Sequence, residues 1–226
     1  DVASGPTLPG GAGLEATSSS LRNWGVWDRL PESVRRRLDA FEGVRKSGSL
    51  DRERVFNFSI GGNAEAVQAA LAEARVLGYE AEAADQPLQW EARMAGTLLA
   101  KQLRALSLPG GKPRALIAGG ETTVAVKGPG RGGRNQELAA SAALELAGKD
   151  GVALLAGATD GVDGSSDAAG AVVTGATCAD EKDAASVRQA LEWNDTHAFF
   201  LERPERLVTG PTGTNVADLA VGLAAL

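Results

Sequence analysis

The sequence has very few of the residues that bind transition metals or form disulfides. Among its 226 residues there is one cysteine, Cys178, and one histidine, His197. A single cysteine excludes an internal disulfide, and neither residue can build a multi-cysteine or multi-histidine metal centre. Acid–base and metal chemistry must therefore rest on carboxylates, which favours Mg²⁺ over zinc.

Long apolar runs and a basic surplus are also missing. No apolar stretch approaches the roughly 20 residues that cross a bilayer, and no basic-then-apolar signal opens the chain. We therefore expect a cytoplasmic protein with no membrane partner. The net charge is −6 and lies mostly in the second half, which argues against general nucleic-acid binding. The chain begins at Asp1 without an initiator methionine, and we expect further sequence upstream.

Strand-like and helix-like segments alternate along the first half. Strands are predicted over residues 54–60 and 79–84, and helices over 66–74 and 89–106. Alternation with short connections favours an α/β fold in which helices pack on a parallel sheet. Two prolines and two glycines within residues 108–113 then indicate a boundary. We therefore predict two domains, residues 1–110 and 111–226.

The second predicted domain continues the α/β pattern. Two strands flank Gly119-Gly120-Glu121, and a glycine-rich loop leads into a helix from Arg134. The predicted strands are 114–118, 122–127, 152–156, 171–174, 206–209 and 216–224, and the predicted helices are 134–147 and 183–193. Ligands on such sheets bind beyond the carboxyl ends of the strands, so the loops after these strands are the candidate site.

The loop from Gly128 to Glu137 is suited to anions. Glycines let backbone N–H groups approach a phosphate closely, and a helix N-terminus adds a positive dipole. Two guanidinium groups are suited to a carboxylate or a phosphate. The residues that we single out are Gly130, Gly132 and Gly133 for a cofactor phosphate, with Arg131 and Arg134 for charge. A flexible hairpin with solvated arginines is the alternative.

Carboxylates follow two of the predicted strands. Asp160 and Asp163 share one turn and are candidate Mg²⁺ ligands, and either one is a candidate base. Glu121, if buried, needs a cation, and Arg134 is the candidate partner. Ordinary turn chemistry is the alternative for the two aspartates, because Asp-Gly pairs are common in turns.

Two further loops carry weaker signals. Gly61, Gly62 and Asn63 stand at a predicted strand end, where they are candidates for the nucleotide or simply cap the following helix. Residues 212–215, which include Thr214 and Asn215, offer hydroxyls and an amide to a hydroxy acid. Capping and turn formation explain these last residues equally well.

Four of these segments together resemble the MOFRL domain of class II glycerate kinases. The strings are GGETT at 119–123, GRGGRNQE at 130–137, TDGVDGSSDAAG at 159–170 and TGPTGTN at 209–215. Their order and spacing match over about 105 residues. ASGPT at 3–7 and WDRLP at 27–31 are similar to strings near the end of that family's N-terminal domain. The resemblance implies a partial Rossmann-like domain followed by a smaller MOFRL-type domain, with the active site in the cleft between them.

The activity that the resemblance implies is phosphorylation of D-glycerate at its 2-hydroxyl by ATP and Mg²⁺. By this likeness, Arg134 binds the substrate carboxylate or the transferring phosphoryl group. Asp160 is the base or a metal ligand, and Asp163 is the alternative residue for either role. Glu121 orients Arg134, and Asn215 contacts the substrate together with Thr214 and Arg131. The expected partner is a small sugar acid. We also expect that the protein can form a homodimer.

The sequence departs from the family pattern in its first half. Gly62 stands where serine is expected, and Trp90 stands where glycine is expected. Two alternative functions stay open. A hydroxypyruvate reductase would use the Gly-x-Gly-x-x-Gly spacing of residues 128–133 for a nicotinamide cofactor. A non-catalytic domain would bind a sugar acid or nucleotide without turnover.

Overall fold

The computed structural model describes residues 14–40, 56, 58, 60–107 and 110–225. The chain forms two compact units, Asp1–Ile60 and Gly61–Leu226. The strings at 3–7 lie outside the described residues, as does most of the strand predicted over 54–60. The described residues of that segment are not in a strand. Among the described residues, no helix combines the length and apolarity that a membrane span requires.

The described residues of the first unit form two helices and a short 3₁₀ turn. They are α1 (Leu14–Asn23), η1 (Trp27–Arg29) and α2 (Glu32–Ala40). The guanidinium of Arg22 stacks 3.8 Å from the ring centroid of Trp27 and lies 3.2 Å from a carboxylate oxygen of Asp39. These contacts tie α1 to the turn and to α2.

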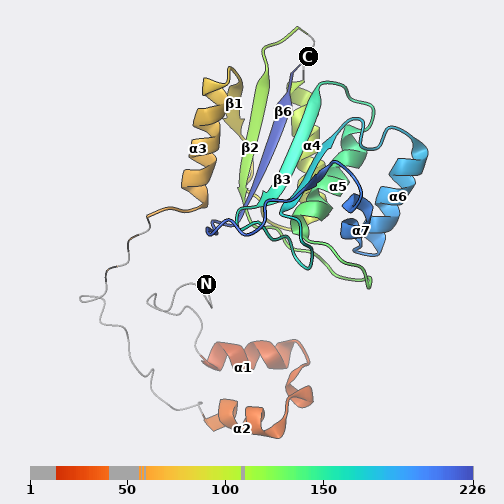
Figure 1. Ribbon diagram of the computed structural model, residues 1–226. Helices are drawn as coiled ribbons and strands as arrows, with labels where there is room; N and C mark the ends of the chain where they lie inside the picture. Colours follow the sequence, from red (N-terminus) through yellow and green to blue (C-terminus); the bar gives the residue numbers. More distant parts are fainter. Residues whose placement is uncertain (1–13, 41–55, 57, 59, 108–109, 226) are drawn as a thin grey trace. The chain divides into compact units, whose positions relative to one another are not determined.

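The second unit is built on one six-stranded sheet with the order β1-β2-β6-β3-β4-β5 (Figure 1). The strands are β1 (Glu80–Ala83), β2 (Arg114–Gly120), β3 (Val152–Ala158), β4 (Gly170–Thr174), β5 (Arg206–Leu207) and β6 (Asp218–Ala224). The α/β class is confirmed. The parallel pairing predicted from the first half is seen for β1 with β2, whereas the other neighbouring pairs are antiparallel.

The last strand explains this difference. β6 runs between β2 and β3 and is antiparallel to both, so β2 and β3 point the same way without being neighbours. A pairing between residues so distant in sequence leaves no local signal. Residues 122–127, predicted as a strand, form only a single bridge, Glu91 to Thr123. As a result, the carboxyl ends of β1, β2 and β3 and the amino end of β6 lie at one edge of the sheet.

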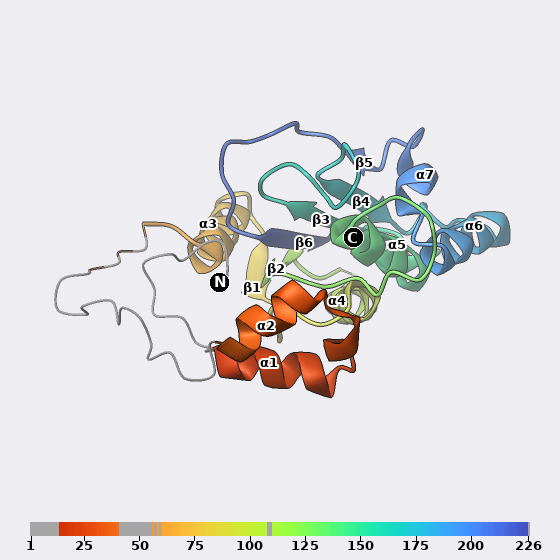
Figure 2. The same ribbon diagram turned by 90° about the horizontal axis from the view of Figure 1, so that it is seen from below.

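Helices cover both faces of the sheet. Figure 2 shows α3 (Asn63–Val76) on one face and α4 (Ala92–Leu106) with α5 (Arg134–Leu146) on the other. α6 (Glu181–Glu192) and α7 (Thr196–Phe200) pack beside α5. α7 was not predicted from the sequence. α4 and α5 approach closely at Gly96, where an added Cβ would lie 2.1 Å from the carbonyl oxygen of Leu138.

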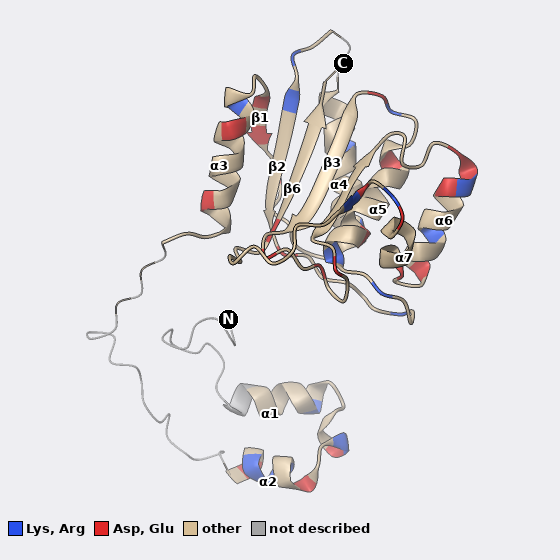
Figure 3. Ribbon diagram, viewed as in Figure 1, with Lys and Arg blue, Asp and Glu red and all other residues tan. Residues whose placement is uncertain are grey.

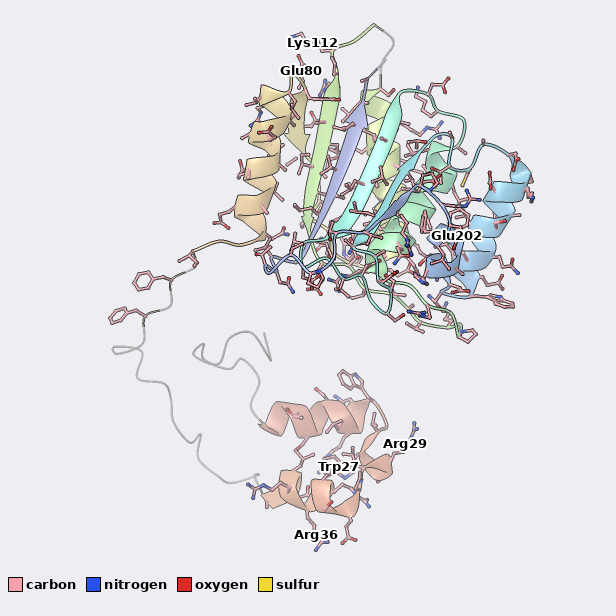
Figure 4. The ribbon with its side chains drawn as sticks, in the orientation of Figure 1. Trp27, Arg29, Arg36, Glu80, Lys112 and Glu202 are labelled. Carbon is pink, nitrogen blue, oxygen red and sulfur yellow. The ribbon has the colours of Figure 1, made fainter. Side chains whose placement is uncertain are left out.

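The predicted domain boundary at residues 110 and 111 lies inside this second unit. β1 comes before the boundary and β2 after it, yet they pair in parallel with Glu80 opposite Arg114. An exposed ion pair of 2.9 Å joins Glu80 to Lys112 at the amino end of these strands, on the edge opposite to the candidate site (Figure 4). That residues 1–110 form the end of a larger domain, with a cleft beside it, stays a prediction.

Candidate functional site

The register of the central strands brings three chain segments together at the lower edge of the sheet in Figure 1. Asp218, the first residue of β6, lies opposite Gly120 of β2 on one side and Ala158 of β3 on the other. The loops that follow β2 and β3, and the loop that precedes β6, therefore converge. Figure 3 shows acidic and basic residues among these loops, whereas the neighbouring strands β3 and β4 carry no charged residue.

Arg134 lies at the centre of this edge and binds two carboxylates. Its Nε and Nη2 contact Asp218 at 2.5 and 3.0 Å, and its Nη1 lies 3.2 Å from Oε1 of Glu121. The Asp218 carboxylate raises the pKa of Arg134 above its ordinary value, more than burial lowers it. A guanidinium held in this way has a fixed orientation and a permanent charge while its side chain stays 30% exposed.

The predicted contact between Glu121 and Arg134 is present, but the stronger partner, Asp218, was missed. Asp218 is 1% exposed and Glu121 is 62% exposed at the side chain. A signal for Asp218 was available, because an aspartate at the start of an apolar strand must pair with a cation if the strand is buried. Only the sheet order shows that the cation is Arg134.

Asp160 and Asn215 also lie together, a contact that was not predicted from the sequence. The side-chain amide of Asn215 donates to Oδ2 of Asp160 at 3.2 Å, and Val162 N–H donates to Oδ1 at 3.0 Å. The Thr212 hydroxyl donates to the carbonyl oxygen of Thr159 at 2.5 Å and so holds the two loops in contact. The carboxylate of Asp160 is only partly buried, and these two donors leave its oxygens with further acceptor capacity.

Thr214 belongs to the same loop but has a local role in this structure. Its backbone N–H donates to the hydroxyl of Thr212 at 3.3 Å, and its carbonyl accepts from that hydroxyl at 3.2 Å. The loop is exposed at Thr214 and Asn215. A substrate contact at Thr214 stays a prediction.

Asp163 caps α5, and this geometry does not favour its predicted role as a metal ligand. The carboxylate is 1% exposed and accepts the backbone N–H groups of Asn135 and Gln136 at 2.9 and 2.8 Å. The side-chain amides of the same two residues donate to it at 3.2 Å each. Burial raises the pKa of Asp163, and these hydrogen bonds offset part of the increase. Four donors occupy its two oxygens, so Asp160 is the more accessible carboxylate.

The glycine-rich loop packs closely against its neighbours and forms no open cradle. A Cβ at Gly130 would lie 2.4 Å from the Cβ of Asp195, and one at Gly132 would lie 2.3 Å from the hydroxyl of Thr196. A Cβ at Gly133 would lie 2.3 Å from the carboxylate of Asp163. The N-terminus of α5 does bind an anion, as its sequence suggested, but that anion is the protein's own aspartate.

Arg131 contacts the loop that joins β3 to β4 and the residue that precedes α7. Its guanidinium donates to the carbonyl oxygen of Ser165 at 2.9 Å, and its backbone N–H donates to Asp195 at 3.0 Å. The side chain is exposed. Substrate binding by Arg131 stays a prediction.

Gly61, Gly62 and Asn63 do reach the site edge, through the first turn of α3. The Asn63 side-chain amide donates to the carbonyl oxygens of Val216 and Asp218 at 2.7 and 3.0 Å. A Cβ at Gly119 would lie 2.2 Å from Oδ1 of Asn63, so the start of α3 and the end of β2 are in close contact. Gly62 is the N-cap of α3 and makes no side-chain capping bond. Nucleotide binding by these residues stays a prediction.

A buried ionic network holds the start of the glycine-rich loop, and sequence reasoning missed it. Glu137 is 2% exposed and accepts from Nε of Arg93 at 2.8 Å and from the Asn194 amide at 2.6 Å. Asn194 in turn accepts the backbone N–H groups of Lys127 and Gly128 at 2.7 and 2.9 Å. The Glu137 carboxylate raises the pKa of Arg93. The sequence did contain a signal for this network, because Glu137 is a charged residue on an otherwise apolar face of its helix.

The donor set at the edge is compatible with Mg²⁺. Among the described residues no group of three or more His, Cys, Asp or Glu side chains is arranged to hold a metal ion. Mg²⁺ in kinases is usually held by one or two carboxylates together with waters and the phosphates of the nucleotide. Asp160 supplies one accessible carboxylate of that kind.

Removing the Asp163 carboxylate is expected to destabilise the protein strongly. Asp163→Ala leaves two buried backbone N–H groups at the start of α5 without a partner, and it also removes two amide contacts. We expect the free energy of unfolding to fall by about 3 kcal/mol. Urea denaturation followed by circular dichroism measures it. Asp167→Ala, at a 65% exposed side chain, is the control with an expected loss below about 1 kcal/mol. Equal losses for the two variants would contradict the capping role.

The chain is similar to a family model and to several known proteins. Residues 114–218 match the model of the MOFRL family. The chain is 39% identical to the D-glycerate 2-kinase of Thermotoga maritima, with 98% of this chain and 52% of that protein aligned. It is 34% identical to a putative hydroxypyruvate reductase of Agrobacterium vitis, covering 97% and 50%. The crystal structure of glycerate kinase from T. maritima superposes with a TM-score of 0.76 at 40% identity, covering 98% and 53%. The chain thus spans about half the length of these relatives.

Proposed function

Because residues 114–218 of this chain belong to the MOFRL family, we propose that it is part of a cytoplasmic, ATP-dependent glycerate 2-kinase. The reaction transfers the γ-phosphoryl group of ATP to the 2-hydroxyl of D-glycerate and gives 2-phosphoglycerate. The observation that carries the proposal is the convergence of Arg134 and Asp160 at one sheet edge, each oriented by a partner from another segment.

The proposed role of Arg134 follows from its fixed charge. D-glycerate and the transferring phosphoryl group are both anions, and a guanidinium binds either one through two parallel hydrogen bonds. Asp218 and Glu121 hold the guanidinium in place, so that it loses little freedom when the ligand binds. Stabilising charge in this way is the main contribution of protein side chains to phosphoryl transfer.

The proposed role of Asp160 is to accept the proton of the 2-hydroxyl or to hold Mg²⁺. Asn215 fixes the carboxylate through Oδ2 and presents an amide to the substrate. Bound Mg²⁺ would neutralise charge on the β- and γ-phosphates of ATP. Thr214 and Arg131 are proposed to make secondary substrate contacts from the two loops that flank this carboxylate.

The reductase alternative is disfavoured by the glycine-rich loop. A nicotinamide cofactor needs its pyrophosphate at a helix N-terminus that directly follows a strand. Here β2 ends at Gly120, well before the loop, and Asp163 fills the N-terminus of α5. The glycines contact Asp195 and Thr196. Asp163 therefore already accepts the backbone N–H groups that a pyrophosphate would need.

Product identification tests the proposal. The longest obtainable form of the protein is incubated with D-glycerate, ATP and Mg²⁺, and the product is identified by ³¹P NMR. We expect 2-phosphoglycerate, and no product when EDTA removes the metal. A parallel assay follows NADH and NADPH consumption with hydroxypyruvate. Reduction of hydroxypyruvate without phosphoryl transfer would favour the reductase, and glycerate binding without either reaction would favour a non-catalytic domain.

A further inference from the structure

A second feature near the carboxyl ends of β1 and β2 is an apolar pocket, and none of the site residues proposed above lines it. It lies between the loop after β1 and one face of α4, and its volume is about 170 Å³. One water needs only about 15 Å³ by this kind of measure, so the pocket has room for a flat ring system. Its principal walls are Pro87, Leu88, Trp90, Leu98, Leu99 and Gln102.

Main-chain hydrogen bonds connect the pocket wall to Gly119 and Glu121 at the end of β2. Leu88 N–H donates to the carbonyl oxygen of Gly119 at 2.8 Å, and Leu88 accepts from the N–H of Glu121 at 2.9 Å. Glu121 in turn contacts Arg134. β1 and β2 are the one parallel pair in this sheet, with α3 and α4 on opposite faces (Figure 2). The carboxyl end of such a pair is where α/β folds bind ligands.

Trp90 stands at this pocket in a conformation that few residues adopt. Its φ is +65°, in the left-handed region that favours glycine, and its side chain is 44% exposed. The conformation is fixed because its carbonyl oxygen accepts both the N–H and the hydroxyl of Thr123, at 2.8 and 3.1 Å. A strained backbone that holds a half-exposed aromatic ring beside a pocket is a feature expected at a ligand site.

We propose that this pocket binds the adenine base of the phosphoryl donor, with the indole of Trp90 stacked on the base. Leu88 and Leu98 contact the base from the walls, and the side-chain amide of Gln102 forms hydrogen bonds with its polar edge. A glutamine amide pairs with the N6 and N7 atoms of adenine, which guanine does not match. This inference rests on the proposed kinase function and extends it by assigning the base site, from which the phosphates extend toward Arg134.

Substitutions at Trp90 separate stacking from folding. Trp90→Gly removes the ring and is compatible with the φ of +65°, so the fold is expected to survive, which a thermal melt checks. Trp90→Phe keeps an aromatic face. Binding of ATP and of inorganic tripolyphosphate is measured by calorimetry on the longest form of the protein, without glycerate. Trp193→Phe, at an exposed tryptophan away from the pocket, is the control.

We expect Trp90→Gly to weaken ATP binding about tenfold and to leave tripolyphosphate binding unchanged, since stacking contributes about that much for one base. Trp90→Phe should stay within about threefold of the parent. Gln102→Leu should reduce the preference for ATP over GTP. Equal affinity of the parent and Trp90→Gly for ATP, or no binding of ATP by the parent, would overturn the inference.

The result is distinguishable from failure of the kinase proposal. If the protein binds ATP through Trp90 but forms no 2-phosphoglycerate, the base site stands and the kinase function fails. If 2-phosphoglycerate forms and the KM for ATP is the same in Trp90→Gly as in the parent, the kinase function stands and the base site is wrong.

Discussion

Asp160→Asn is expected to lower kcat for glycerate phosphorylation about a thousandfold while changing the KM for glycerate less than about threefold. General-base catalysis contributes about 10²–10⁴ in rate, and an amide cannot accept the proton. Asparagine keeps the shape of the side chain and an oxygen for Val162 N–H, so the loop is expected to stay folded. Steady-state kinetics on the longest form of the protein measure both constants.

Asp167→Asn is the matched control for this prediction. Asp167 belongs to the same loop, but its carboxylate lies beside Arg206 at 3.3 Å and is 65% exposed. We expect kcat within about twofold of the parent, because the loss of an exposed ion pair has little effect. A full-rate Asp160→Asn enzyme would remove Asp160 from the reaction and leave its geometry as loop packing.

Arg134→Lys is expected to have the second largest effect. Lysine keeps the charge but cannot contact Asp218 through two parallel bonds and Glu121 through a third at the same time. We expect kcat/KM to fall at least a hundredfold. The free energy of unfolding should also fall by about 2 kcal/mol, because the buried Asp218 carboxylate loses a charged hydrogen bond. Kinetics and urea denaturation on the same preparation measure the two effects.

Arg203→Lys tests whether any partly buried ion pair gives the same result. The Arg203 side chain is 31% exposed, close to the 30% of Arg134, and contacts Asp183 in the first turn of α6 at 2.6 Å. For Arg203→Lys we expect the free energy of unfolding to fall by about as much as for Arg134→Lys, while kcat/KM stays unchanged. A comparable loss of activity in both variants would mean that Arg134 acts through stability alone.

The site residues at this edge of the sheet were predictable where they directly follow a strand. Glu121 and Asp160 come directly after buried strands, and the carboxyl ends of strands that run in the same direction lie at the same edge of a sheet. The contact of Glu121 with Arg134 was predicted, whereas that of Asp160 with Asn215 was not. Asp218 was not predictable in the same way, because its partner depends on β6 lying between β2 and β3. Neither hydrophobic periodicity nor turn residues encode that order.

The N-terminus of α5 shows a different limit. Glycines before a helix predict a site for an anion, and the structure contains one. The local sequence does not reveal that the anion is Asp163, about 30 residues further along the chain. Trp90 was a departure from the family pattern in the sequence, and its φ of +65° now gives the reason that glycine is expected there.

The most direct test of this account is glycerate-dependent ADP release by the longest obtainable form of the protein, with Mg²⁺ present. We predict that ADP forms only when D-glycerate is added and that each ADP is matched by one 2-phosphoglycerate. If a complete, folded protein binds D-glycerate and ATP but releases no ADP, the edge formed by Arg134 and Asp160 is not a phosphoryl-transfer site.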